Sequence, residues 1–78
     1  MKLNNYLKKR RVRLEISQAN LAKLIGFTTA QQVSNYERNN CPVPMASFKA
    51  LAKHLRIPAK NIKLLALKDF EDKLGNHI

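Results

Sequence analysis

Apolar residues recur at helical spacing along almost the whole chain, and no stretch alternates apolar and polar residues as a half-buried strand would. Leu3, Leu7 and Leu14 share one helical stripe in this way, and Phe48 and Leu51 belong to another. The chain has only two glycines and three prolines, which stand between the periodic segments. The pattern therefore predicts an all-α fold of five helices without an internal repeat.

Capping and helix-breaking residues set the expected boundaries. Ser17 is a good N-cap for the second helix, and either Thr28 or Thr29 can cap the third. Gly26 stands where a helix end favours a left-handed residue, and Pro58 opens the last helix. The helices are expected at residues of about 3–14, 17–25, 29–38, 45–55 and 58–74.

Length and charge limit the classes of function. A chain of 78 residues predicts one domain, 1–78, with a modest core and no deep substrate cavity. Lys and Arg outnumber Asp and Glu by 15 to 5, which gives a net charge of +10. Such a balance favours a polyanionic partner, either nucleic acid or an anionic membrane surface. The single cysteine, Cys41, and the lack of a membrane-length apolar run favour a cytoplasmic protein.

The sequence gives little sign of catalysis. Its two histidines are far apart, and Cys41 lacks the repeated Cys/His spacing of a zinc site. The acidic residues Asp69, Glu71 and Asp72 crowd one segment and are interpreted as a solvated patch. We therefore expect neither an enzyme nor a bound metal or cofactor.

The segment around residues 30–38 is unusually rich in neutral hydrogen-bonding groups. At about 100° per residue, Val33 and Tyr36 point toward the core. The opposite arc then carries four polar side chains, Gln31, Ser34, Asn35 and Arg38, with Gln32 on its flank. Gln and Asn pair with adenine through two hydrogen bonds in the DNA major groove. This face fits a groove-reading helix, and the alternative is an ordinary solvated face.

The run ISQANLAKLIGFTTAQQVSNYERN resembles the helix-turn-helix of the phage-repressor and Cro type, the XRE family. The resemblance rests on the Ile16-Ser17-Gln18 opening, Leu21-Ala22, the turn glycine Gly26 and the run from Val33 to Glu37. It implies a compact lambda-repressor-like domain with its helix-turn-helix at about 17–38. One departure is Glu15, which stands where the family usually has glycine. The turn between the first and second helices is therefore expected to differ from that of the family.

The resemblance also implies roles for individual residues. Arg11 and Glu37 match a structural salt bridge. The residues implied in base reading are Gln31, Gln32, Ser34 and Asn35, with Thr29 also in reach. Those expected at phosphates are Gln18, Arg38, Asn39, Asn40 and Arg10. Arg10 belongs to a cationic cluster with Lys8, Lys9 and Arg13, which either flanks the DNA or acts as a long-range field.

The resemblance favours a DNA-binding repressor that occupies an inverted repeat as a homodimer. The expected dimer interface is on the last helix, at Leu65, Phe70 and Leu74, and the alternative for these residues is packing within one chain. The alternative function is an antitoxin-type module that neutralises a partner protein, either a toxin or a co-regulator. A protein that binds membrane surfaces or other polyanions without sequence preference is a third hypothesis.

Overall fold

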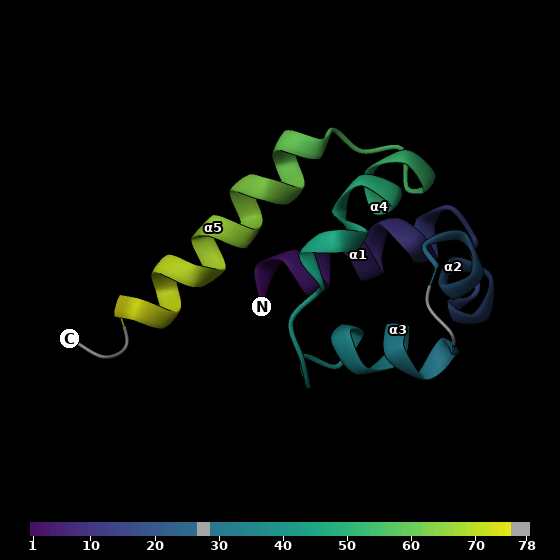
Figure 1. Cartoon of the computed structure of the whole chain (residues 1–78), viewed down its shortest axis with the longest axis horizontal. Coiled ribbons are helices and arrows are strands. Elements are labelled where there is room, and N and C mark those ends of the chain that lie inside the picture. The colour runs from purple at the N-terminus through teal and green to yellow at the C-terminus, as the bar shows by residue number, and fades with distance from the viewer. Residues whose placement is uncertain (27–28, 76–78) are drawn as a thin grey trace.

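The computed structural model describes residues 1–26 and 29–75, with side chains described through Glu71. Within these residues the chain is all-helical, as predicted. The α-helices are α1 (Lys2–Arg13), α2 (Gln18–Leu24), α3 (Ala30–Glu37), α4 (Phe48–His54) and α5 (Ala59–Gly75), and the short 3-10 helix η1 (Met45–Ser47) precedes α4. Figure 1 shows α1 near the centre, α3 along one edge, and α5 running past α1 and projecting beyond the other helices.

The core is built from the apolar stripe of every helix. Leu7 of α1, Leu21 of α2 and Val33 of α3 are completely buried, and so are Leu51 of α4 and Ile62 of α5. A single cluster of buried side chains therefore joins all five helices. Because α3 packs against both α1 and α2, its orientation is set by two neighbours.

Several helices end in left-handed residues other than glycine. After α1, Glu15 has a φ of 57°, its N–H donates to Val12 O, and the N–H of Ile16 donates to Arg11 O. This is the Schellman arrangement. Asn39 after α3 and Arg56 after α4 have φ values of 62° and 56°. Glu15 thus adopts the backbone conformation that glycine favours, even though it is not glycine.

The caps of the helix-turn-helix are partly as expected. The Ser17 hydroxyl accepts a hydrogen bond from the Asn20 N–H at 3.0 Å, and Gly26 has a φ of 81°. Thr29 is the N-cap of α3, but its side chain makes no capping hydrogen bond. Thr28, the alternative cap, lies outside the described residues.

Asp69 links α5 to the beginning of α1. The backbone N–H groups of Lys2 and Leu3 donate to its two carboxylate oxygens at 2.8 and 3.0 Å. A carboxylate in this position satisfies N–H groups that have no partner within the helix and complements the helix dipole. The interpretation of Asp69 as part of a solvated acidic patch is therefore wrong, because a tertiary contact occupies its carboxylate.

Candidate nucleic-acid interface

Helix α3 turns its apolar residues inward and its amides outward. Val33 and Tyr36 are 0% and 1% exposed, whereas Gln31 and Gln32 are exposed and Asn35 is half-buried. The predicted orientation of these side chains is confirmed. The prediction that Ser34 lies on the open arc is wrong, because Ser34 is only 8% exposed. Two packing neighbours bury a wider arc of α3 than one neighbour would, which removes Ser34 from the proposed base-reading set.

The two outward amides on successive turns of α3 are hydrogen-bonded to each other. The Gln31 Nε2 group donates to Asn35 Oδ1 at 2.9 Å. Residues four apart on a helix lie one above the other, so this bond links the two amide groups across one turn. Thr29 and Gln32 are exposed beside them at the beginning of α3. The exposed start of α3 thus presents a row of neutral donors and acceptors.

The end of α3 is held by a buried ion pair with α1. Arg11 Nε donates to Glu37 Oε2 at 2.6 Å, and Arg11 Nη2 donates to Glu37 Oε1 at 3.0 Å. The Arg11 and Glu37 side chains are only 12% and 2% exposed. Arg11 Nη1 also donates to Ile16 O at 2.7 Å. The predicted salt bridge is confirmed, and its bidentate geometry fixes α3 against α1.

Gln18 contributes to the same contact from α2. Its Nε2 group donates to Glu37 Oε1 at 2.9 Å, so one carboxylate accepts hydrogen bonds from both α1 and α2. This bond braces α3 against α2. The role of Gln18 at a phosphate stays a prediction.

Asn4 is a structural residue that the sequence patterns did not reveal. It is 1% exposed, and its Nδ2 group donates to Tyr36 O at 2.7 Å and to Cys41 O at 3.0 Å. Buried amides need such partners. The available signal was its position between Leu3 and Leu7 on the apolar side of α1. We call Asn4, Arg11, Gln18 and Glu37 the α3 anchor.

Burial also affects Tyr36, the residue preceding Glu37. Desolvation by burial raises the pKa of the Tyr36 hydroxyl well above its ordinary value. The Glu37 carboxylate raises this pKa further, and the Arg11 guanidinium opposes the change. The anchored end of α3 therefore favours neutral Tyr36.

Arg10 does not point toward the α3 surface. Its Nε donates to Leu55 O at 2.9 Å and its Nη2 to Arg56 O at 3.4 Å. The guanidinium thus donates hydrogen bonds to carbonyl groups at the end of α4, where a positive charge also interacts favourably with the helix dipole. This contact removes Arg10 from the phosphate-contacting set.

Arg38, Asn39 and Asn40 form the exposed turn after α3. Asn40 N–H donates to Asn35 O, and Asn39 N–H donates to Tyr36 O, both at 3.0 Å. The Asn39 Oδ1 atom accepts a hydrogen bond from the Met1 nitrogen at 3.1 Å. The turn therefore has a defined shape next to the anchored end of α3, with the Arg38 side chain exposed.

The expected dimer residues have different surroundings. Leu65 is partly buried against the core of its own chain, which favours intramolecular packing for this residue. Phe70 is 57% exposed, and the side chain of Leu74 lies outside the described part of the chain. Met45, also exposed, lines an apolar groove with Leu67 and Phe70 between α5, the beginning of α1 and the segment 42–48. Sequence periodicity did not reveal this groove, because its walls come from separate elements.

Among the described residues, no helix is long and apolar enough to cross a membrane. The same residues contain no group of three or more His, Cys, Asp or Glu side chains that could hold a metal ion.

Comparison with known proteins agrees with this geometry. The family model described as helix-turn-helix matches residues 7–62, which is most of the chain. A similar solved structure is that of the P22 c2 repressor protein in complex with synthetic operator 9T in the presence of Tl⁺. It aligns with a TM-score of 0.70 and 26% sequence identity, covering 80% of this chain and 92% of that one. No curated protein sequence gives a significant match.

Proposed function

The chain belongs to the helix-turn-helix family, and on this basis we propose that it is a sequence-specific transcriptional regulator that represses by occupying an operator in double-stranded DNA. The family and the fold are those of DNA-binding regulators rather than of enzymes. Because such a regulator works where the genome lies, we expect it in the cytoplasm.

One observation carries the proposal. The amides of Gln31 and Asn35 project from a helix whose other end is fixed by buried hydrogen bonds. A reading helix needs this combination, because hydrogen bonds to base edges require side chains held at a defined depth and angle. The similar P22 c2 repressor was solved with a synthetic operator. In our proposal Gln31 and Asn35 read bases, assisted by Gln32 and Thr29.

The phosphate contacts are proposed on two sides of this helix. Arg38, Asn39 and Asn40 would contact the backbone beside the end of α3, and Gln18 would approach a phosphate at the beginning of α2. The N–H groups at a helix N-terminus attract an anion, and the net charge of +10 supports binding to DNA. These contacts position the protein without specifying sequence.

Selection of bound duplexes from a random pool tests base reading. We expect a consensus site, and Gln31→Ala and Asn35→Ala should each weaken binding to it by about 1–3 kcal/mol. Random DNA should lose much less affinity. Asn5→Ala, which removes an exposed amide from α1, is the matched control and should bind as the parent does. Equal losses on consensus and random DNA would rule out base reading by these residues.

We further propose that a second copy docks at the groove formed by Met45, Leu67 and Phe70. These side chains are 79%, 52% and 57% exposed and lie together. A group of exposed apolar side chains on a small domain often marks an interaction site. A two-fold dimer would read an inverted repeat. The Phe70→Lys variant should reduce cooperative binding to an inverted repeat and leave binding to one half-site unchanged.

Leu64→Lys is the control for the dimer, because Leu64 is similarly exposed (53%) and lies on the same helix but does not line the groove. Analytical ultracentrifugation with and without DNA supplies the direct measurement. A parent protein that binds the repeat as independent monomers would refute the dimer.

The antitoxin alternative predicts a complex with a partner protein that survives high salt, and no feature of the described residues favours it over DNA reading.

A further inference from the structure

Apart from Lys2 at its start, the cations of α1 divide into two groups. The guanidinium groups of Arg10 and Arg11 donate hydrogen bonds to acceptors within the protein. Lys8, Lys9 and Arg13 are exposed instead. Within the part of the chain that the structure describes, the ion pair between α1 and α3 joins Arg11 to Glu37, and these three side chains take no part in it. Beyond the first turn of α1, they are therefore the cations available for a partner.

Helical register places Lys8 next to α3. Asn4, Lys8 and Arg11 are separated by four and three residues, so they follow one stripe of α1. Asn4 donates to Tyr36 O, and Arg11 donates to the Glu37 carboxylate. Both contacts are at the end of α3. Lys8 is thus the exposed member of a stripe whose other two members bind that end.

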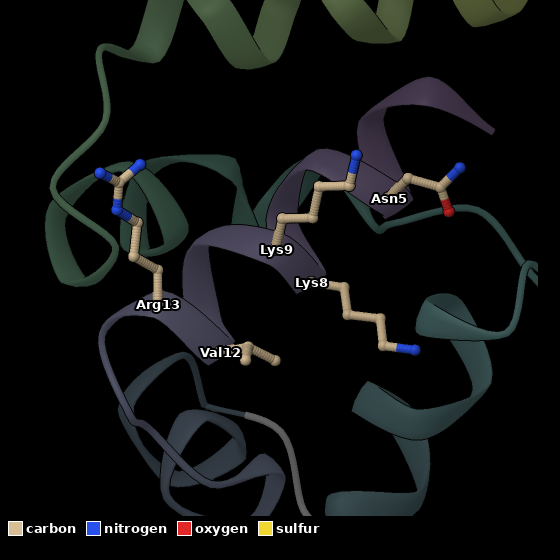
Figure 2. A pocket seen from close by; sticks show the side chains of 5 residues that line it. All are labelled: Asn5, Lys8, Lys9, Val12 and Arg13. Atoms are coloured by element: carbon tan, nitrogen blue, oxygen red, sulfur yellow. The ribbon is translucent and has the colours of Figure 1, made fainter.

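The remaining two cations leave α1 in other directions. Figure 2 shows the Lys8 side chain extending toward α3, Lys9 toward α5, and Arg13 toward the connection between α4 and α5. These directions agree with the register, because Lys9 and Arg13 are each displaced from the stripe of Asn4 and Arg11. The three charges consequently do not converge on one ligand.

We propose that Lys8 is a phosphate-contacting residue, which binds the DNA backbone beside the turn formed by Arg38, Asn39 and Asn40. This inference rests on the proposed DNA-binding function and assigns a contact from α1 to it. Lys9 and Arg13 contribute only to the long-range positive field. The sequence cluster around Arg10 therefore contains one contacting residue, and that residue is Lys8.

The chemistry of the group suits this role. A lysine ammonium is a compact charge on a flexible stem, so it binds a phosphate without requiring the planar geometry of a guanidinium. Each phosphate that a cation neutralises releases counterions and steepens the salt dependence of binding. Lys8 should thus add about one unit to the slope of log K against log[salt].

The test compares Lys8→Gln, Lys9→Gln and Arg13→Gln in DNA-binding titrations at several salt concentrations. All three side chains are exposed, so unfolding curves should coincide and loss of binding would not reflect misfolding. Lys8→Gln should weaken binding roughly fivefold to tenfold at moderate salt and lower the salt slope by about one. The other two variants should change the slope less, and Lys8→Arg should retain most of the affinity.

A second measurement locates the contact on the DNA. Duplexes with single neutral methylphosphonate linkages remove one phosphate charge at a time. At the linkage that Lys8 contacts, the parent protein and Lys8→Gln should bind with equal affinity, whereas they differ on all other duplexes. A double-mutant cycle of this kind isolates the pairwise term. If no linkage removes the difference, or if Lys9→Gln gives the same slope as Lys8→Gln, the inference is wrong.

The two proposals can fail separately. A phosphate contact also acts on random DNA, so the difference between Lys8→Gln and Lys9→Gln is measured there as well. A parent protein without sequence preference would overturn the proposed regulator, while a persistent difference on random duplexes would still support Lys8. Sequence-specific binding with no such difference would overturn the role of Lys8 alone.

Discussion

The two ends of α3 are held in different ways. At its end, the carboxylate of Glu37 accepts from Arg11 and Gln18, and Asn4 donates to the preceding carbonyl of Tyr36. At its beginning, Thr29 makes no side-chain cap, and the Gln31 amide bonds to Asn35 within the same helix. The anchored end is thus tied to α1 and α2 by buried side chains, whereas the beginning exposes its polar groups.

This difference separates stability from recognition along a helix of eight residues. Substitutions at the anchored end should change the free energy of unfolding, because they leave buried polar groups without partners. Substitutions at the beginning should change DNA affinity and have little effect on folding, because those side chains are exposed. The following predictions test this separation, beginning with the largest expected effect.

Removal of one member of the buried ion pair should have the largest effect. Arg11→Ala or Glu37→Ala should lower the free energy of unfolding by about 3–5 kcal/mol, because the remaining charge stays buried. Urea denaturation followed by circular dichroism measures the change. The double variant Arg11→Met/Glu37→Leu should recover much of the loss, although Gln18 then lacks its acceptor. A loss below 1 kcal/mol in both single variants would contradict the assignment of the pair as an anchor.

Asn4→Ala tests the second contact of the anchored end. The carbonyl groups of Tyr36 and Cys41 would lose this donor, and we expect a destabilisation of about 2 kcal/mol. Asn5→Ala is a matched control, because Asn5 is the exposed neighbour on the same helix. Thermal unfolding of the two variants gives the comparison. Equal melting temperatures would show that the Asn4 amide adds nothing to the anchor.

High pH should destabilise the anchored end through Tyr36. Its folded-state pKa is raised above the ordinary value of 10.0, so its contribution is complete below pH 10 and is lost as the pH rises further. The free energy of unfolding should fall by up to about 1.4 kcal/mol per pH unit for this one group. Both proteins share every other ionisable group, so the measured quantity is the difference from Tyr36→Phe. Parallel stability curves for the two proteins above pH 10 would contradict the prediction.

The contrast between the ends of α3 also shows what the sequence could predict. Periodicity was sufficient for the five helices and for the outward direction of Gln31 and Asn35, because both depend on local spacing. The resemblance to a family supplied the pair of Arg11 and Glu37, whose members lie 26 positions apart.

Other features depended on packing between distant elements and were not predicted. Periodicity does not report how many helices cover one face, so the burial of Ser34 was missed. Asp69 was interpreted as a solvated charge and Arg10 was expected at a phosphate. In the structure, Asp69 accepts from backbone N–H groups of α1, and Arg10 donates to backbone carbonyl groups at the end of α4. Lone polar residues such as Asn4 carry no motif. For Asp69, Arg10 and Asn4 the partner is a backbone group, which leaves no pattern of residue types to recognise.

An added N-cap at the beginning of α3 should change the free energy of unfolding least, and Thr29 is the position for it. Thr29→Asp supplies a carboxylate that can accept from backbone N–H groups of the first turn of α3, and it should raise the free energy of unfolding by about 0.5–1 kcal/mol. The same charge would face the DNA phosphates, so affinity should fall as stability rises. Thr29→Ser separates the two causes, because a hydroxyl can cap without adding charge. If Thr29→Ser weakens DNA binding as much as Thr29→Asp does, then the conformation of this end, rather than its charge, controls recognition.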